Sequence, residues 1–169
     1  MGRVVFLIGA SGAGKTMVAQ VLEQRAPWAG NTHYFDSIGV PSDEVMAAQF
    51  GGPEGWQRWA TRQWMARLVG GDAALQLIEG STRPSFIRAA AEPHRGLELR
   101  IVLLECSAEV RRHRLVELRG QPELATSRMD SWAAYLRGQA DALGLPVLDT
   151  TRSTPEAIAD EIEARSGPA

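Results

Sequence analysis

The stretch GASGAGKT, from Gly9 to Thr16, carries the clearest chemistry in the chain. It matches G-x-x-x-x-G-K-[ST] in full, and it lies between a strand-like apolar run and a helical pattern, as this motif requires. Glycines let backbone amides approach an anion closely, and a helix N-terminus favours negative charge. Lys15, the only lysine in the sequence, adds a flexible point charge, and the hydroxyl of Thr16 suits Mg²⁺. The predicted nucleotide-binding residues here are Gly9, Ser11, Gly12, Ala13, Gly14, Lys15 and Thr16.

Two carboxylates follow other apolar runs. Glu79 ends LQLIE, where a second group that organises Mg²⁺ through water is expected, although it is also suited to capping the next helix. Asp36 ends HYFD, where a carboxylate can orient or deprotonate an attacking hydroxyl, although D-S-I-G is also a favourable turn sequence. If both runs are strands of one parallel sheet, the two side chains meet at its carboxyl edge.

Arginines supply the remaining candidate charges. Arg83 follows Glu79 closely and is able to grip a phosphate or carboxylate. Arg114 and Arg119 belong to an arginine-rich helix that ends beside a Gly-Gln-Pro loop, a pattern that favours a closing lid over the transferred phosphate. Arg152 follows the last strand-like run and is predicted to stack on the nucleotide base. Each of these arginines is equally compatible with a solvated surface position.

The elements that would position these residues alternate along the chain. Strand-like runs cover 3–8, 33–35, 75–79, 99–105 and 146–149, and helical patterns cover 15–26, 43–50, 54–69, 84–93, 107–118, 127–143 and 155–165. This alternation predicts an α/β fold whose parallel sheet is covered on both faces.

Residues 38–69 are predicted to cover the acceptor. Trp56, Ala60, Trp64 and Leu68 recur every four residues and are interpreted as a core stripe. Arg58 and Trp59 lie off that stripe and are candidate acceptor-binding residues. The aromatic pair Trp132 and Tyr135 is interpreted as core, and the three scattered histidines show no metal-binding spacing.

Composition limits the alternatives. The net charge of -2 gives no overall attraction to nucleic acid or anionic membranes. The single cysteine, Cys106, excludes an internal disulfide framework and is expected to be buried. No apolar stretch approaches the roughly 20 residues that cross a bilayer, and the first strand begins too early for a signal peptide. We therefore expect a cytoplasmic protein, and both a monomer and a homodimer remain open.

Taken in order, these segments resemble the nucleoside-monophosphate-kinase-like branch of the P-loop kinases, which includes shikimate kinase, gluconate kinase and chloramphenicol phosphotransferase. The likeness rests on GASGAGKT, Asp36, IEG with Glu79, R-x-x-R-L-x-x-x-R-G, and DTT before Arg152. The resemblance implies a three-layer P-loop fold with a five-stranded parallel sheet in the order 2-3-1-4-5, ATP with Mg²⁺, and a small acceptor near Asp36. IEGSTR replaces the GGG of shikimate kinases, which disfavours shikimate, and no base-reading pattern favours a nucleoside monophosphate.

The sequence thus predicts one P-loop kinase domain over 1–169, with an acceptor-binding region at 38–69 and a lid at 111–128. Its expected activity is transfer of the γ-phosphoryl group of MgATP to a hydroxyl of a small molecule. A polynucleotide 5′-kinase or other nucleic-acid-processing ATPase is one alternative, and a non-catalytic nucleotide-dependent switch is another. The predicted catalytic residues are Lys15, Asp36, Arg114 and Arg119. The predicted acceptor-binding residues are Asp36, Arg58, Trp59 and Arg83, and the predicted metal-binding residues are Thr16 and Glu79.

Overall fold

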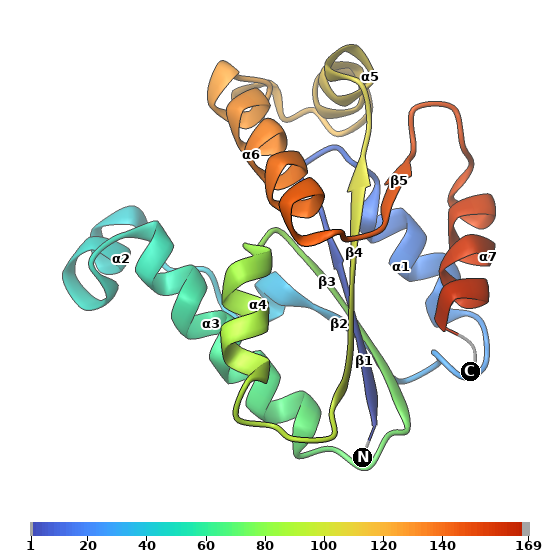
Figure 1. The fold of residues 1–169 in the computed structure, drawn as a ribbon. Coiled ribbons are helices and arrows are strands. Elements are labelled where there is room, and N and C mark those ends of the chain that lie inside the picture. Colours follow the sequence, from blue (N-terminus) through green and yellow to red (C-terminus); the bar gives the residue numbers. More distant parts are fainter. Residues whose placement is uncertain (1, 167–169) are drawn as a thin grey trace.

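Five parallel strands form one sheet in the computed structural model, which describes residues 2–166 (Figure 1). Their order is β2-β3-β1-β4-β5, as the resemblance implies. Residues 1 and 167–169 of the predicted domain lie outside the described residues. The strands are β1 (Arg3–Ile8), β2 (Thr32–Tyr34), β3 (Leu75–Gly80), β4 (Glu98–Glu105) and β5 (Val147–Asp149).

Helices cover both faces of this sheet, which confirms the predicted three-layer α/β fold (Figure 1). One face is covered by α1 (Lys15–Glu23) and α7 (Pro155–Ser166). The other is covered by α3 (Pro53–Val69), α4 (Pro84–Ala91) and α6 (Ser127–Leu143). The shorter α2 (Asp43–Phe50) packs beside α3, and α5 (Ala108–His113) follows β4.

The central strand β1 shows why the two layers form. Val4, Phe6 and Ile8 are buried among α3, α4 and α6, whereas Val5 and Leu7 are buried toward α1 and α7. Successive side chains of a strand point to opposite faces, so a continuous apolar run fits a strand that is covered on both sides. This placement fixes the loop after Ile8 at the carboxyl edge of the sheet, where ligands bind in such folds.

Two segments differ from the prediction. The second strand ends at Tyr34, and Phe35–Ile38 form the 3₁₀ helix η1, so Asp36 lies in a tight turn rather than in the strand. The predicted helix over 107–118 is α5 followed by a π-helical turn, η2 (Arg114–Leu118), in which the Arg119 amide donates to the Arg114 carbonyl at 3.0 Å. Another 3₁₀ turn, η3 (Pro122–Leu124), precedes α6.

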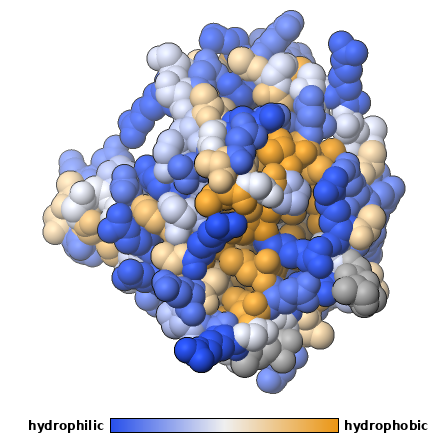
Figure 2. Space-filling model, in the orientation of Figure 1, coloured by the Kyte–Doolittle hydropathy of each residue, from blue (hydrophilic) through white to orange (hydrophobic). Residues whose placement is uncertain are grey.

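The sheet is open beside β4. β5 pairs with Leu103–Glu105 of β4, and a depression lined by Leu99, Ile101 and Leu145 lies along the earlier part of that strand. Figure 2 shows hydrophobic surface gathered near the centre of this view, framed by hydrophilic side chains. Among the described residues, no helix is long and apolar enough to cross a membrane.

Candidate active site

The glycine-rich loop joins β1 to α1 at the carboxyl edge of the sheet, as predicted. Gly12 and Gly14 have φ angles of 82° and 93°, a left-handed region that strains other residues. A β-carbon at Gly9 would lie 2.5 Å from the Leu104 carbonyl oxygen of β4, and one at Gly12 would lie 2.9 Å from the Arg111 side chain. The glycines therefore serve both the loop conformation and its close packing against β4 and the lid.

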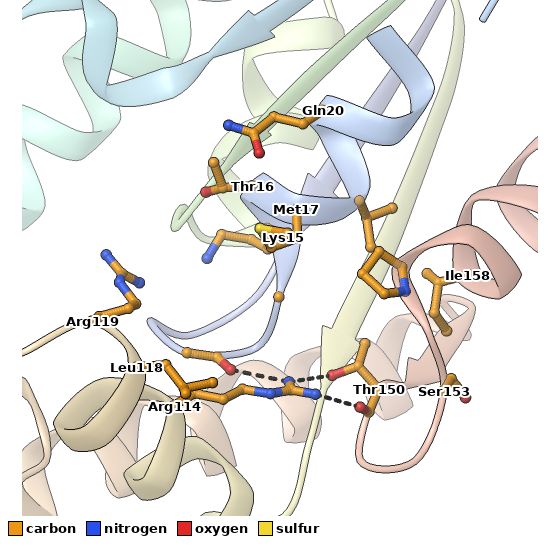
Figure 3. Close-up of a pocket in the computed structure, with 14 residues that line it drawn as sticks. Lys15, Thr16, Met17, Gln20, Arg114, Leu118, Arg119, Thr150, Ser153 and Ile158 are labelled. Carbon is orange, nitrogen blue, oxygen red and sulfur yellow. Dashed lines mark hydrogen bonds between the residues drawn. The ribbon is translucent and has the colours of Figure 1, made fainter. Parts of the chain in front are cut away.

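A pocket of about 470 Å³ opens beside this loop (Figure 3). Charged and polar groups gather at one end, where Lys15, Thr16 and Arg119 lie near the loop. Apolar side chains from α1, the lid and the start of α7 also line the pocket. These apolar lining residues are Met17, Val18, Leu118, Pro155 and Ile158. This combination of charged and apolar groups suits a nucleotide, whose phosphates are charged and whose base is flat and largely apolar.

Lys15 and Glu79 form the electrostatic centre of the site. Lys15 is buried, and its Nζ donates to the Ala10 carbonyl at 3.1 Å. Burial lowers the pKa of Lys15 below its ordinary value, while the negative charges of Glu79 and Asp36 oppose that change. Burial likewise raises the pKa of Glu79, and the charge of Lys15 opposes it. The buried ammonium of Lys15, on which the charges of two carboxylates act, is therefore available to bind an anionic ligand.

The predicted metal-binding pair is brought together. Thr16 Oγ1 lies 3.4 Å from Glu79 Oε1, and within residues 2–166 no other side chain donates a hydrogen bond to this buried carboxylate. The described residues include no cluster of three or more His, Cys, Asp or Glu suited to a metal. A metal ion here would rest on one hydroxyl, one carboxylate and the phosphates of the ligand. That donor set of oxygens fits Mg²⁺, which usually takes few protein ligands and retains waters.

The two predicted lid arginines occupy different positions. Arg119 is exposed at the phosphate end of the pocket, and its positive charge acts on Lys15. Arg114 is half-buried and is held by protein acceptors: Nη1 donates to the Gly12 carbonyl at 3.2 Å and to Thr150 Oγ1 at 2.9 Å, and Nη2 donates to the Thr150 carbonyl at 2.7 Å. Arg119 is therefore the arginine with freedom to reach a transferred phosphate.

Arg152 is not brought into the pocket. It is exposed and is absent from the lining, whereas Ser153 and Pro155 from the same segment are present. Sequence order alone did not show that Arg152 lies outside the pocket, because adjacent residues in a loop point in different directions. Gly9, Ser11 and Ala13 are likewise absent from the lining, and Gly9 and Ala13 are buried.

The turn that carries Asp36 is held in place by two tryptophans of α3. The Trp64 indole donates to the Phe35 carbonyl at 2.8 Å, and the Phe35 ring meets the Trp56 ring edge-on at a centroid distance of 6.1 Å. A β-carbon at Gly80 would lie 2.3 Å from Phe35 Cβ, so only glycine allows this approach. Asp36 itself is exposed. The predicted core stripe on α3 is confirmed, and it also supports the Asp36 turn, a role that its spacing did not reveal.

Arg83 is enclosed by other side chains. Its guanidinium donates to Gln57 Oε1 at 2.6 Å and lies 5.0 Å from the Trp132 ring and 5.6 Å from the Tyr135 ring. Glu54 lies 3.4 Å away as an ion-pair partner. These contacts tie α3, α4 and α6 together at the carboxyl edge. The interpretation of Tyr135 as core is wrong, because this ring is 40% exposed and stacks on Trp132 beside Arg83.

The other predicted acceptor residues lie on the same helix, α3, but are more exposed. Arg58 pairs with Glu54 at 3.3 Å and lies 4.8 Å from the centre of the Phe86 ring. Trp59 is 40% exposed and lies 5.2 Å from the Phe50 ring of α2. Together they form an aromatic and basic rim rather than a closed pocket.

Solved structures that are similar to this chain include two kinases and a resistance protein. A shikimate kinase from Acinetobacter baumannii in complex with shikimate is 19% identical, with a TM-score of 0.64, and the match covers 98% of this chain and 93% of that one. The Deinococcus radiodurans tunicamycin resistance protein is 19% identical, with a TM-score of 0.68 and coverage of 100% and 98%. A gluconokinase from Sinorhizobium meliloti 1021 is 20% identical, with a TM-score of 0.68 and coverage of 96% and 90%.

These structures confirm the predicted P-loop kinase fold over nearly the whole chain. No protein-family model and no curated protein matches the sequence. The similarity therefore lies in the arrangement of the elements, and the function has to be argued from the site itself.

Proposed function

We propose that the protein is an ATP-dependent phosphotransferase that moves the γ-phosphoryl group of MgATP to a hydroxyl of a small molecule. The observation that carries this proposal is the position of Asp36, which lies in the η1 turn two residues after Tyr34, the residue of β2 that pairs in register with Glu79 at the carboxyl edge of the sheet. A carboxylate beside the phosphate-binding lysine, on a turn outside the nucleotide pocket, is suited to receive an acceptor hydroxyl.

In the proposed reaction, the acceptor oxygen attacks the γ-phosphorus while the bond from that phosphorus to the β–γ bridging oxygen breaks. ADP leaves with the electron pair, and the acceptor proton passes to the Asp36 carboxylate. Lys15 and the amides of residues 12–16 hold the phosphates, and Arg119 balances charge on the group in transfer. Mg²⁺, bound by Thr16 and Glu79, would neutralise phosphate charge. The protein contributes mainly positioning and electrostatic stabilisation.

The similar structures support this choice of reaction. Two of the three are kinases, and one of them is described with its small-molecule ligand bound. In this chain, Arg83 of the acceptor region is engaged by Gln57 and Glu54 and is framed by aromatic rings. We therefore propose the reaction class and leave the acceptor to experiment.

A transfer assay on a metabolite pool tests the proposal. The protein is incubated with MgATP and the pool, and mass spectrometry identifies compounds that gain one phosphoryl group. The expected result is acceptor-dependent ADP release with a phosphorylated product, and Asp36→Asn should abolish both. ADP release without any phosphorylated product would contradict the proposal.

The same assay separates the two alternatives. A polynucleotide 5′-kinase would label oligonucleotide ends rather than small molecules, and it would need an extended basic surface that the net charge of -2 does not favour. A nucleotide-dependent switch would bind MgATP without transfer to any acceptor.

A further inference from the structure

Thr150 lies at the centre of the contact between the lid, the glycine-rich loop and the end of β5. Its side chain is buried, with 3% of the residue exposed. Thr150 Oγ1 is 2.8 Å from the Ala13 carbonyl oxygen and 3.1 Å from the Glu105 carbonyl oxygen. It is also 2.9 Å from Arg114 Nη1 (Figure 3). One hydroxyl therefore joins three segments that are far apart in the sequence.

The direction of each hydrogen bond follows from counting protons. A threonine hydroxyl has one hydrogen to donate, and arginine can only donate, so Thr150 Oγ1 accepts from Arg114. The Glu105 carbonyl already receives the Thr150 backbone amide at 2.8 Å. The hydroxyl hydrogen is therefore free to go to the nearer Ala13 carbonyl. Accepting from a guanidinium polarises the hydroxyl and strengthens its own donation.

The bond to Ala13 has a consequence on the other side of the same peptide unit. A trans peptide is planar, and its C=O and N–H point in opposite directions. Fixing the Ala13 carbonyl toward Thr150 therefore turns the Gly14 amide away from Thr150. Gly14 lines the nucleotide pocket, and its φ of 93° is open to glycine without strain, so contacts with the peptide units select this conformation of the loop.

The preceding peptide unit is held in a related way. The Gly12 carbonyl receives Arg114 Nη1, and the Ala13 amide donates to the Ala10 carbonyl at 3.1 Å. The Ala10 carbonyl is also the acceptor for Lys15 Nζ. Arg114 and Thr150, which also line this pocket, thus fix two consecutive carbonyls of the loop.

We infer that Thr150 is a positioning residue whose hydroxyl orients the Ala13–Gly14 peptide so that the Gly14 amide faces the nucleotide phosphates. This inference rests on the proposed function, because it requires phosphates in the pocket. The lid could then influence phosphate affinity without contacting the phosphates, because Arg114 donates hydrogen bonds to the Thr150 hydroxyl and to the Gly12 carbonyl.

The test compares Thr150→Val, which keeps the shape and removes the hydroxyl, with Thr150→Ser, which restores it. Calorimetry measures MgATP binding, and ligand-observed NMR measures adenosine binding. Thr150→Val should weaken MgATP binding by about tenfold to a hundredfold, because an amide aimed at an anion is lost along with the supporting bond. Adenosine binding should change by less than about twofold, and Thr150→Ser should restore most of the MgATP affinity.

The neighbouring Thr151→Val is the matched control. Thr151 Oγ1 accepts the Ser107 amide at 3.0 Å, so this variant loses a threonine hydrogen bond of similar length. It should bind MgATP as the wild type does. If Thr150→Val fails to fold, Thr150→Ala removes the same hydroxyl without placing a methyl group against two carbonyl oxygens.

The outcomes separate this inference from the proposed function. If the wild type does not bind MgATP, both the proposed function and the positioning role of Thr150 are contradicted. If the wild type binds MgATP and a folded Thr150→Val or Thr150→Ala variant binds it equally well, the positioning role alone is overturned. It is also overturned if Thr150→Ser binds as weakly as Thr150→Val, or if adenosine affinity falls in parallel with MgATP affinity, because either result indicates general disruption of the pocket.

Discussion

The proposed nucleotide side and the proposed acceptor side of this site use different kinds of chemical groups. On the nucleotide side, the ligand would meet mainly backbone amides and one lysine. Hydrogen bonds from Thr150 and Arg114 to two carbonyls of the loop hold this backbone in place. On the acceptor side, Asp36 sits on a short turn that is supported by an indole hydrogen bond and by aromatic packing. Both sides depend on side chains that are distant in the sequence, but on the nucleotide side these hold the backbone of a glycine-rich loop, whereas on the acceptor side aromatic side chains of α3 hold a short turn.

This difference explains how specificity can vary within one fold. A backbone cradle for phosphates needs small residues at fixed spacing, and changing them disrupts the loop itself. The acceptor side can exchange side chains on α3 and α6 without disturbing that cradle. Arg83, with its Gln57, Glu54 and aromatic contacts, is such an exchangeable arrangement. The four predictions that follow disturb one side at a time.

The largest expected effect is that of Asp36→Asn. Asparagine keeps the shape of the side chain but cannot accept the proton of the attacking hydroxyl, so kcat for acceptor phosphorylation should fall about 10²- to 10⁴-fold. MgATP affinity should stay within a few-fold of wild type. Steady-state kinetics and calorimetry check the two values. Asp43→Asn, at an exposed aspartate in the first turn of α2, is the control and should have wild-type kinetics.

Lys15→Ala disturbs the opposite side. Loss of the ammonium should lower kcat/KM for MgATP about 10²- to 10³-fold, because the lysine is a preorganised charge at the phosphates. The circular dichroism spectrum should match that of the wild type. Arg95→Ala removes an exposed positive charge at a distant turn and should leave kcat/KM unchanged. A Lys15→Ala variant with wild-type turnover would remove the lysine from the phosphate site.

Trp64→Phe tests whether acceptor phosphorylation depends on the hydrogen bond that holds the Asp36 turn in place. Losing the indole bond to the Phe35 carbonyl should cost about 1 kcal/mol of stability and lower kcat about tenfold, with MgATP affinity retained. Trp56→Phe is a matched control on the same helix, because the Trp56 indole N–H has no hydrogen-bond partner within the described residues. Equal losses of kcat in the two variants would assign the effect to packing rather than to the hydrogen bond.

Glu79→Gln should have the smallest effect, on the stability of the free protein. The pKa of Glu79 is raised in the folded state, so folding favours its neutral form, and the wild type loses stability as pH rises through that pKa. Glutamine resembles the neutral form. The variant should melt about 2–4 °C higher at pH 7 without ligand, a shift equivalent to about 1 kcal/mol.

The pH dependence provides the check. The gap in melting temperature should narrow as the pH falls and Glu79 of the wild type takes up a proton. Glu92→Gln, at an exposed position after α4, should show no such gap. A wild type that is more stable than Glu79→Gln at pH 7 would show that the pairing of Glu79 with Lys15 outweighs the cost of burial.

The comparison of the two sides also shows what sequence reasoning could reach. The placement of Lys15, Thr16 and Glu79 was predictable, because a fixed motif and alternating apolar runs determine it locally, whereas the strand order was implied by the family resemblance. The η1 turn was not predictable, because the Trp64 bond that holds it spans 29 residues. Thr150 was named only as part of a strand-end loop, since nothing in DTT distinguishes the threonine that faces Ala13 from its neighbour.

The lid shows the same limit. Its arginine-rich sequence predicted a closing lid, but spacing did not show that Arg114 would donate to the Gly12 and Thr150 carbonyls while Arg119 stayed exposed. The π-helical turn between them changes the direction in which these side chains project. Such turns often occur at functional sites and have no clear sequence signature.

A calorimetric titration with MgATP tests the central claim, that this loop and Lys15 bind the phosphates of a nucleotide. The wild type should give saturable heat for one site per chain, with a dissociation constant below about 1 mM, the upper end of the usual range for enzyme substrates. Lys15→Ala should shift the titration to much weaker binding. If the folded wild type gives no saturable heat at millimolar MgATP, or if Lys15→Ala binds as tightly as the wild type, the claim is contradicted.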